Sequence, residues 1–143
     1  MLMHDNMSSQ ALREISPVVL AYVGDAVFEL AVRTYIIADG HRRVKDIHHD
    51  TVEFVKAESQ ARVIRQIFDE LDEEERDIVK RGRNTKTGVS KHAHLRDYKM
   101  STGFEALLGF LYLKGDLRRL HDLINKSLGT TGDELTEEGE QDR

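Results

Sequence analysis

The chain has 143 residues, a length that suits one domain with its own hydrophobic core. It contains no cysteine, which excludes a disulfide framework and a thiolate metal site and fits a reducing compartment such as the cytoplasm. The net charge is -5, and residues 130–143 alone, with six acids and one arginine, carry that whole excess. The rest of the chain is formally neutral, so overall charge does not exclude nucleic acid as a partner.

The first predicted element is a helix that begins at Ser16-Pro17, because serine is a favoured N-cap and proline is favoured at the first helical position. Residues 1–15 before it are polar, carry no signal-peptide pattern and are predicted to form an extension. Gly40 is predicted to end the helix near Ala38. The helix is apolar nearly all round, which predicts a position at the centre of the fold, buried on every side.

This helix is long enough to cross a bilayer, but it contains Asp25, Glu29 and Arg33. Each of them would cost roughly 2.5 to 3.5 kcal/mol near the centre of a membrane. We therefore predict a helix of a soluble protein, with no membrane as a partner.

Further helices follow along the chain. Apolar residues recur at helical spacing over 44–71, which predicts two helices with a break near Glu58-Ser59. Asp72 is predicted to cap a short helix that ends at Arg81, and the polar residues 84–97 are predicted to form a loop.

Ser101 or Thr102 is predicted to cap an apolar helix over 104–113, and Asp116 to cap a last amphipathic helix that ends at Gly129. No stretch alternates as a strand would, so the predicted fold class is all-α. The acidic tail is predicted to be disordered. The chain is thus divided into an extension (1–15), one domain (16–129) and a tail (130–143).

Two acids interrupt apolar helices. Asp25 lies in LAYVGDAVFELAV (residues 20–32), and Glu105 lies in GFEALLGFLYL (residues 103–113). A lone acid in such a helix is as often a structural, ion-paired residue as a functional one, but a second acid in the same setting favours function. Two facing carboxylates repel each other unless a proton or a cation lies between them. We therefore predict a magnesium site formed by Asp25 and Glu105, with Gly24 allowing the two helices to approach closely.

The segment KRGRNTKTGVSKHAHLRDYK, residues 80–99, holds seven Lys/Arg and one Asp. One interpretation is a solvated segment neutralised by the acidic residues 69–77. The alternative is contact with phosphates, because small hydroxyl, amide and glycine residues alternate with the bases. The residues predicted to contact RNA are Lys80, Arg81, Arg83, Asn84, Lys86, Thr87 and Lys91.

Histidines suggest a further alternative. His48-His49-Asp50, the pair His92 and His94, and His121-Asp122 are compatible with a phosphohydrolase whose metal is bound by His and Asp. With seven histidines in a highly charged chain, such pairs also arise easily by chance.

The segments LAYVGDAVFELAVR, KRGRNTKTG and YKMSTGFEALLGFLYL, in this order, resemble the catalytic domain of ribonuclease III. The closest resemblance is to the stand-alone bacterial branch called Mini-ribonuclease III, for which the RGRN run is the more specific sign. The resemblance covers Ser16 to Leu128 and implies the helical ribonuclease III endonuclease fold. Asp25 and Glu105 match two family acids, whereas Ala21 and Thr102 stand where the family has two more.

The resemblance implies a Mg²⁺-dependent endoribonuclease, with Mn²⁺ as a substitute, that cleaves double-stranded RNA and leaves 5′-phosphate ends. It also implies a homodimer formed through apolar residues flanking Gly24. The implied substrate is the precursor of 23S ribosomal RNA, processed in the cytoplasm, where an auxiliary ribosomal protein is a further expected partner. The loss of two family acids keeps open a catalytically silent RNA-binding module of the ribosome on the same fold.

Overall fold

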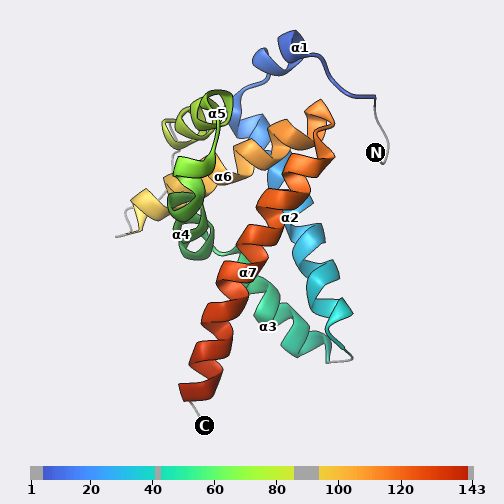
Figure 1. The fold of residues 1–143 in the computed structure, drawn as a ribbon, viewed down its shortest axis with the longest axis vertical. Coiled ribbons are helices and arrows are strands. Elements are labelled where there is room, and N and C mark those ends of the chain that lie inside the picture. Colours follow the sequence, from blue (N-terminus) through green and yellow to red (C-terminus); the bar gives the residue numbers. More distant parts are fainter. Residues whose placement is uncertain (1–4, 41–42, 86–93, 142–143) are drawn as a thin grey trace.

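The structure, a computed structural model, describes residues 5–40, 43–85 and 94–141. These residues form seven α-helices and one short 3-10 helix and no strand, which confirms the predicted all-α class (Figure 1). The helices are α1 (Ser9–Arg13), α2 (Pro17–Ala38), α3 (Val44–Val55), α4 (Ala57–Ile67), η1 (Phe68–Glu70), α5 (Glu73–Arg83), α6 (Leu95–Lys114) and α7 (Leu117–Gln141).

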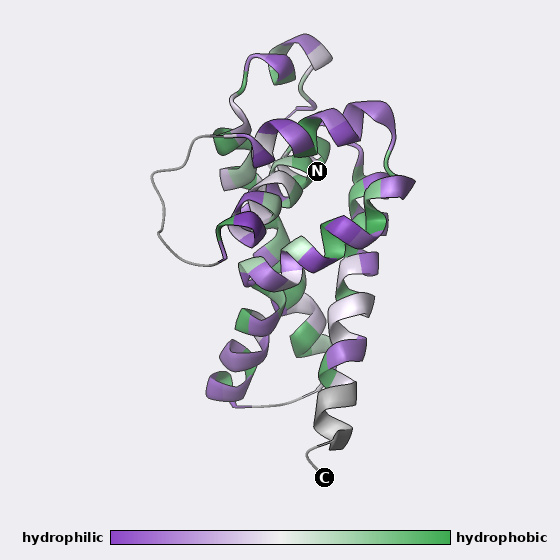
Figure 2. Cartoon of the chain, turned by 90° about the vertical axis from the view of Figure 1, so that its left-hand side faces the viewer, coloured by the Kyte–Doolittle hydropathy of each residue, from purple (hydrophilic) through white to green (hydrophobic). Residues whose placement is uncertain are grey.

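Helix α6 is the centre of the molecule. It packs most extensively on α2 and also contacts α4, α5 and α7. Nearly all of its residues from Ser101 to Leu111 are buried, and Phe104 meets Phe28 of α2 edge-to-face at 5.4 Å between ring centroids. The helices carry hydrophobic residues where they meet and hydrophilic residues on their outer faces (Figure 2). Burial of α6 therefore fixes the place of Glu105, which lies within its buried stretch.

Several predicted helix ends are confirmed. Ser16 caps α2, with its Oγ accepting a hydrogen bond from the Val19 N–H at 3.3 Å, and the helix ends at Ala38. Asp72 caps α5 and forms a capping box with Glu75. The break between α3 and α4 falls at Lys56, two residues before the predicted position.

The start of α6 was predicted wrongly. The helix begins at Leu95, so residues 95–97 are helical and neither Ser101 nor Thr102 is a cap. Both hydroxyls instead donate to the carbonyl of Tyr98 one turn earlier, at 2.7 and 3.0 Å. Serine and threonine bond in this way inside helices as well as at their ends, so their presence alone does not mark a start.

The end of α7 was also predicted wrongly. Gly129 does not end the helix, which continues through residue 141 and so includes most of the tail that was predicted to be disordered. Thr131 is 4% exposed and Leu135 packs against the core, so this part of the tail has its own contacts. Glu134 also pairs with Arg62 of α4.

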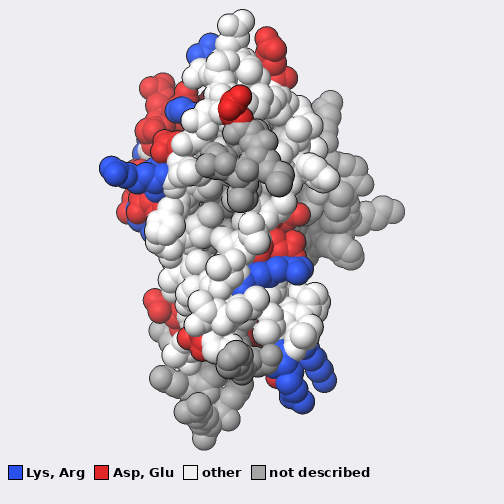
Figure 3. All heavy atoms as spheres, turned by 90° about the vertical axis from the view of Figure 1, so that its right-hand side faces the viewer, with Lys and Arg blue, Asp and Glu red and all other residues white. Residues whose placement is uncertain are grey.

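Helix α2 is buried on one side only, which corrects the prediction of complete burial. Leu20, Phe28, Val32 and Ile36 face the core, but six large apolar residues are exposed: Val18, Val19, Tyr22, Leu30, Tyr35 and Ile37. On the side of the molecule where α2 lies in Figure 1, uncharged residues dominate the middle of the surface (Figure 3). Within the described parts of the chain, no helix combines the length and apolar content needed to cross a bilayer.

Candidate functional site

A cavity of about 420 Å³ lies where α2, α4 and α6 meet beside the end of α3. It contains both acids singled out in the sequence. Its lining residues are Val18, Ala21, Tyr22, Asp25, Val55, Ala57, Gln60, Tyr98, Ser101, Thr102 and Glu105. The structure therefore brings together Asp25 and Glu105, which are far apart in the sequence.

Two glycines let the backbones of α2 and α6 come together at this cavity. A Cβ atom on Gly24 would lie 1.7 Å from the carbonyl oxygen of Glu105, and one on Gly109 would lie 1.9 Å from the carbonyl oxygen of Leu20. No side chain fits at either position unless the helices separate. The predicted role of Gly24 in close helix approach is confirmed.

The two acids differ in their surroundings. Asp25 is exposed, whereas Glu105 is half-buried, so the expectation of a buried aspartate is wrong. Burial of Glu105, its hydrogen bond with the Asp25 side chain and the charge of Asp25 raise the pKa of Glu105 to about 9, while the amide of Gln60 acts in the opposite direction. Near neutral pH Glu105 therefore keeps its proton, which removes the repulsion that two facing carboxylates would otherwise have.

The positions of the two missing family acids face the same cavity. Ala21 and Thr102 both line it, and the Thr102 hydroxyl is already bonded to the carbonyl of Tyr98. Among the described residues, no group of three or more His, Cys, Asp or Glu side chains is placed to hold a metal ion. Two carboxylates with room for water are still a donor set that fits Mg²⁺, which keeps several waters and needs few protein ligands.

Sequence analysis missed one residue of this cavity. Gln60 of α4 is 2% exposed, and its Nε2 is buried without a hydrogen-bond partner among the described residues. A signal was available in the sequence, since Gln60, Val63, Ile64 and Ile67 recur at helical spacing and form the buried face of α4. A polar side chain on such a face calls for a partner or a function.

Part of the predicted RNA-contact segment lies at the end of α5, which packs on α6. Lys80, Arg81 and Arg83 belong to the last turn of α5, which ends two residues beyond the predicted end at Arg81, and Asn84 is its C-cap. Within this turn, Gly82 packs on α6, where an added Cβ would lie 2.8 Å from Gly103 Cα. The basic end of α5 thus adjoins the turn of α6 that carries Glu105, whereas Lys86, Thr87 and Lys91 lie outside the described residues.

The histidine pairs do not form a metal site in the described part of the chain, where no cluster of metal-binding side chains occurs. His48 and His49 belong to α3, His121 belongs to α7, and His94 is the residue before α6. His92 lies outside the described residues. The phosphohydrolase alternative thus has no support among the described histidines.

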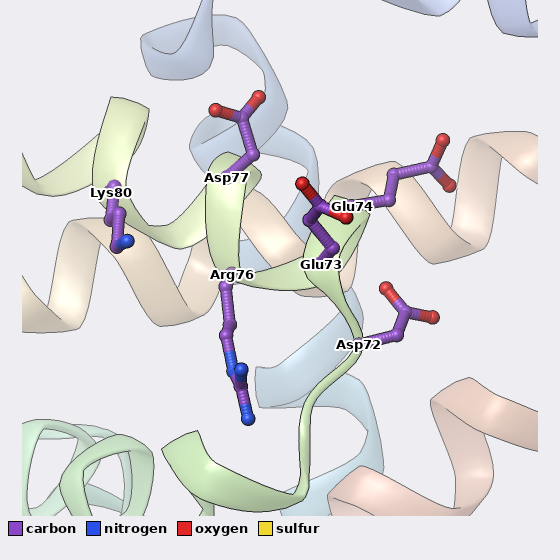
Figure 4. A pocket seen from close by; sticks show the side chains of 6 residues that line it. All are labelled: Asp72, Glu73, Glu74, Arg76, Asp77 and Lys80. Carbon is purple, nitrogen blue, oxygen red and sulfur yellow. The ribbon is translucent and has the colours of Figure 1, made fainter.

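A second hollow, of about 1030 Å³, lies over the first turns of α5 and is lined by Asp72, Glu73, Glu74, Arg76, Asp77 and Lys80. Its carboxylates spread apart rather than converge (Figure 4). Acids in the first turn of a helix are explained by the positive end of the helix dipole. This hollow shares no lining residue with the Asp25–Glu105 cavity. The helix dipole accounts for its acids, so no ligand is needed to explain them.

Comparison with known proteins identifies the family. Residues 18–116 match the Ribonuclease III domain. The chain is 44% identical over 123 residues to the Mini-ribonuclease 3 of Thermoanaerobacter sp., covering 85% of this chain and 87% of that protein. It is 42% identical over 138 residues to the Mini-ribonuclease 3 of Clostridium tetani, covering 95% and 91%. A crystal structure of a Fusobacterium nucleatum protein superposes with a TM-score of 0.75 at 30% identity, covering 83% of this chain and 96% of that one.

The chain belongs to the ribonuclease III family, in the branch of the Mini-ribonuclease 3 proteins. It is accordingly an endoribonuclease. The family resemblance inferred from the GDA, RGRN and FEALLG segments is confirmed.

Proposed function

We propose that this endoribonuclease cleaves double-stranded RNA with a divalent cation held by Asp25 and Glu105. The single observation that carries the proposal is the cavity in which these two carboxyl groups meet, where burial and the contact with Asp25 raise the pKa of Glu105. A cation in place of the Glu105 proton would remove the repulsion between the two carboxylates. Mg²⁺ suits two carboxylates completed by water, and Mn²⁺ is expected to substitute.

The residues that line this cavity have different proposed roles. Asp25 is exposed and open to an approaching RNA backbone, while half-buried Glu105 is fixed by the packing of α6. When bound, the cation would supply positive charge at the scissile phosphate and lower the pKa of the attacking water. Ala21 and the small side chain of Thr102 leave space for that water, and the products expected from the resemblance have 5′-phosphate and 3′-hydroxyl ends.

The proposed RNA-binding surface includes the basic end of α5. Lys80, Arg81 and Arg83 adjoin the α6 turn of Glu105 through the contact between Gly82 and Gly103. Such side chains suit phosphate contacts along an A-form duplex, which proteins recognise mainly by shape and backbone. The proposed substrate is the precursor of 23S ribosomal RNA in the cytoplasm, and an auxiliary ribosomal protein stays a prediction.

We also propose a homodimer. Cleavage of both strands of a duplex needs two catalytic sites, and this chain has one pair of acids in the cavity; a two-fold dimer supplies the second. Val19, Tyr22, Ala26, Leu30 and Ile37 are exposed and recur along α2 at helical spacing. This α2 stripe is an apolar surface that a second copy of α2 would cover.

A cleavage assay on duplex RNA tests the proposed chemistry. The wild-type protein is expected to cut in Mg²⁺, to stop in EDTA and to resume when Mg²⁺ is restored, while Asp25→Asn stays inactive throughout. The replacement of two family acids by Ala21 and Thr102 favours one competing function, a silent RNA-binding module. A wild-type protein that binds duplex RNA but cuts none at any Mg²⁺ or Mn²⁺ concentration would establish that alternative.

A further inference from the structure

Gln60 is a polar side chain on an otherwise apolar face. It lies in the first turns of α4, on the buried face that continues through Val63, Ile64 and Ile67. The neighbouring Ser59 is also buried, but its hydroxyl donates to the carbonyl of Glu53 at 2.6 Å. Gln60 therefore differs from Ser59 in having a buried polar atom that the fold leaves without a partner.

That atom is a hydrogen-bond donor at the wall of the catalytic cavity. Nε2 of Gln60 is buried with no acceptor among the described residues, although the side chain lines the same cavity as Asp25 and Glu105. A buried donor without an acceptor costs about 1 to 3 kcal/mol. This cost is explained if another state of the protein supplies an acceptor for the Gln60 donor.

Glu105 is the acceptor that the geometry offers. The Gln60 amide is close enough to the Glu105 carboxyl group to favour its ionised form. In the structure, however, the Glu105 carboxyl is engaged with Asp25. A cation between the two acids would replace that contact and let the Glu105 carboxylate turn, so that the oxygen not bound to the ion accepts from Gln60.

We propose that Gln60 is a positioning residue, whose Nε2 donates to the Glu105 carboxylate when a divalent cation is bound and fixes the oxygen that faces the ion. The inference rests on the metal site proposed above. Carboxylates that bind metals are commonly held by such hydrogen bonds, and removing the supporting residue typically lowers metal affinity about 10- to 100-fold.

The substitution Gln60→Met tests this role, because it keeps the length and unbranched shape of the side chain and removes the donor. Mg²⁺ affinity, measured by calorimetry without RNA, is expected to fall about 10-fold or more. The melting temperature of the metal-free variant is expected to stay the same or to rise, because a buried donor without an acceptor is gone. Gln66→Met is the matched control, since Gln66 lies on the same helix but is exposed, and its metal affinity should equal that of the wild type.

A second measurement uses the unmodified side chain. The chain has four glutamines, so selective ¹⁵N-glutamine labelling gives four side-chain amide signals. One of them, protected from solvent exchange, should move when Mg²⁺ is added, and this shift should be absent in Glu105→Ala.

Three outcomes would overturn the inference. Wild-type Mg²⁺ affinity in Gln60→Met, or a protected amide signal that moves only when RNA is added, would overturn it while leaving the metal site intact. A wild-type protein that binds no divalent cation would overturn both the inference and the proposed metal-dependent function.

Discussion

Asp25 and Glu105 meet in one cavity, and this contact gives the aspartate a testable signature. We expect Asp25→Asn to abolish RNA cleavage, because one of the two proposed metal ligands is lost, and to leave RNA binding within a few-fold of the wild type. Without metal and above about pH 9, where Glu105 is ionised in the wild type, the variant should be no less stable than the wild type, since a repelling carboxylate has become a neutral amide. Thermal melting in EDTA measures this, and a large loss of stability would show that Asp25 is a structural anchor.

The raised pKa of Glu105 predicts how stability depends on pH. In the unfolded chain the pKa of this carboxyl returns toward 4.5, whereas it is about 9 in the folded protein. Between these values the folded state holds a proton that the unfolded state lacks, so the free energy of unfolding falls as pH rises. The metal-free melting temperature should therefore decline from about pH 5 to about pH 9 more steeply in the wild type than in Glu105→Gln.

The raised pKa of Glu105 also predicts how many protons are released when the proposed cation binds. Near neutral pH the proposed cation would have to displace the proton of Glu105, so its binding should release about one proton per site. Calorimetry in buffers of different ionisation enthalpy measures that number. Parallel stability curves for the wild type and Glu105→Gln, together with no proton release, would contradict the raised pKa.

At the scale of elements, the approach of α2 and α6 builds the site. In Gly24→Ala the added Cβ would meet the carbonyl oxygen of Glu105 at 1.7 Å, and backbone on both sides leaves no flexible group to yield. We expect a loss of about 3 kcal/mol or more in the free energy of unfolding, measured in urea. Gly129→Ala is the control, because Gly129 lies within α7 and a Cβ there meets nothing among the described residues within 4 Å. That variant should gain up to about 1 kcal/mol.

Local sequence signals predicted the starts of two helices correctly but not the end of α7. Ser16-Pro17 and Asp72 defined two starts correctly because capping is decided by neighbouring residues. The end of α7 depends instead on tertiary contacts, since Thr131 and Leu135 pack against the rest of the fold beyond Gly129. The pairing of Asp25 with Glu105 was predicted from their chemistry, whereas Gln60 was missed because only the placement of α4 against α6 shows that it lines the same cavity.

The basic end of α5 gives a prediction for RNA binding. Replacing Lys80, Arg81 and Arg83 with Ala should lower the slope of log affinity against log salt by roughly 0.7 to 0.9 for each phosphate contact that is lost. Turnover at saturating RNA should change far less, because the two acids are untouched. The control replaces three exposed basic residues elsewhere, Arg13, Lys45 and Arg118. An unchanged salt slope with collapsed turnover would mean that this end of α5 shapes the catalytic site instead.

At the scale of the whole molecule, the α2 stripe leaves apolar surface exposed while the opposite side of the same helix fills the core. Tyr22 is 80% exposed and lines the cavity, so the stripe adjoins the proposed catalytic site. A second copy packed on α2 would cover this surface and place two cavities in one assembly, as cleavage of both strands requires. In such a dimer, assembly and catalysis would be coupled through α2.

Leu30→Glu tests that coupling without touching the cavity. Leu30 is 58% exposed and does not line the cavity, so the folded monomer should keep its stability. A carboxylate in the stripe would have to lose its water in the dimer, and removing a charge from water is strongly unfavourable. Sedimentation should therefore show a dimer for the wild type at low micromolar concentration and a monomer for Leu30→Glu, with cleavage of both strands lost. Leu117→Glu, at an exposed leucine outside the stripe, should remain dimeric. A monomeric wild type that still cuts both strands would exclude the two-fold assembly and leave the apolar face of α2 to another partner.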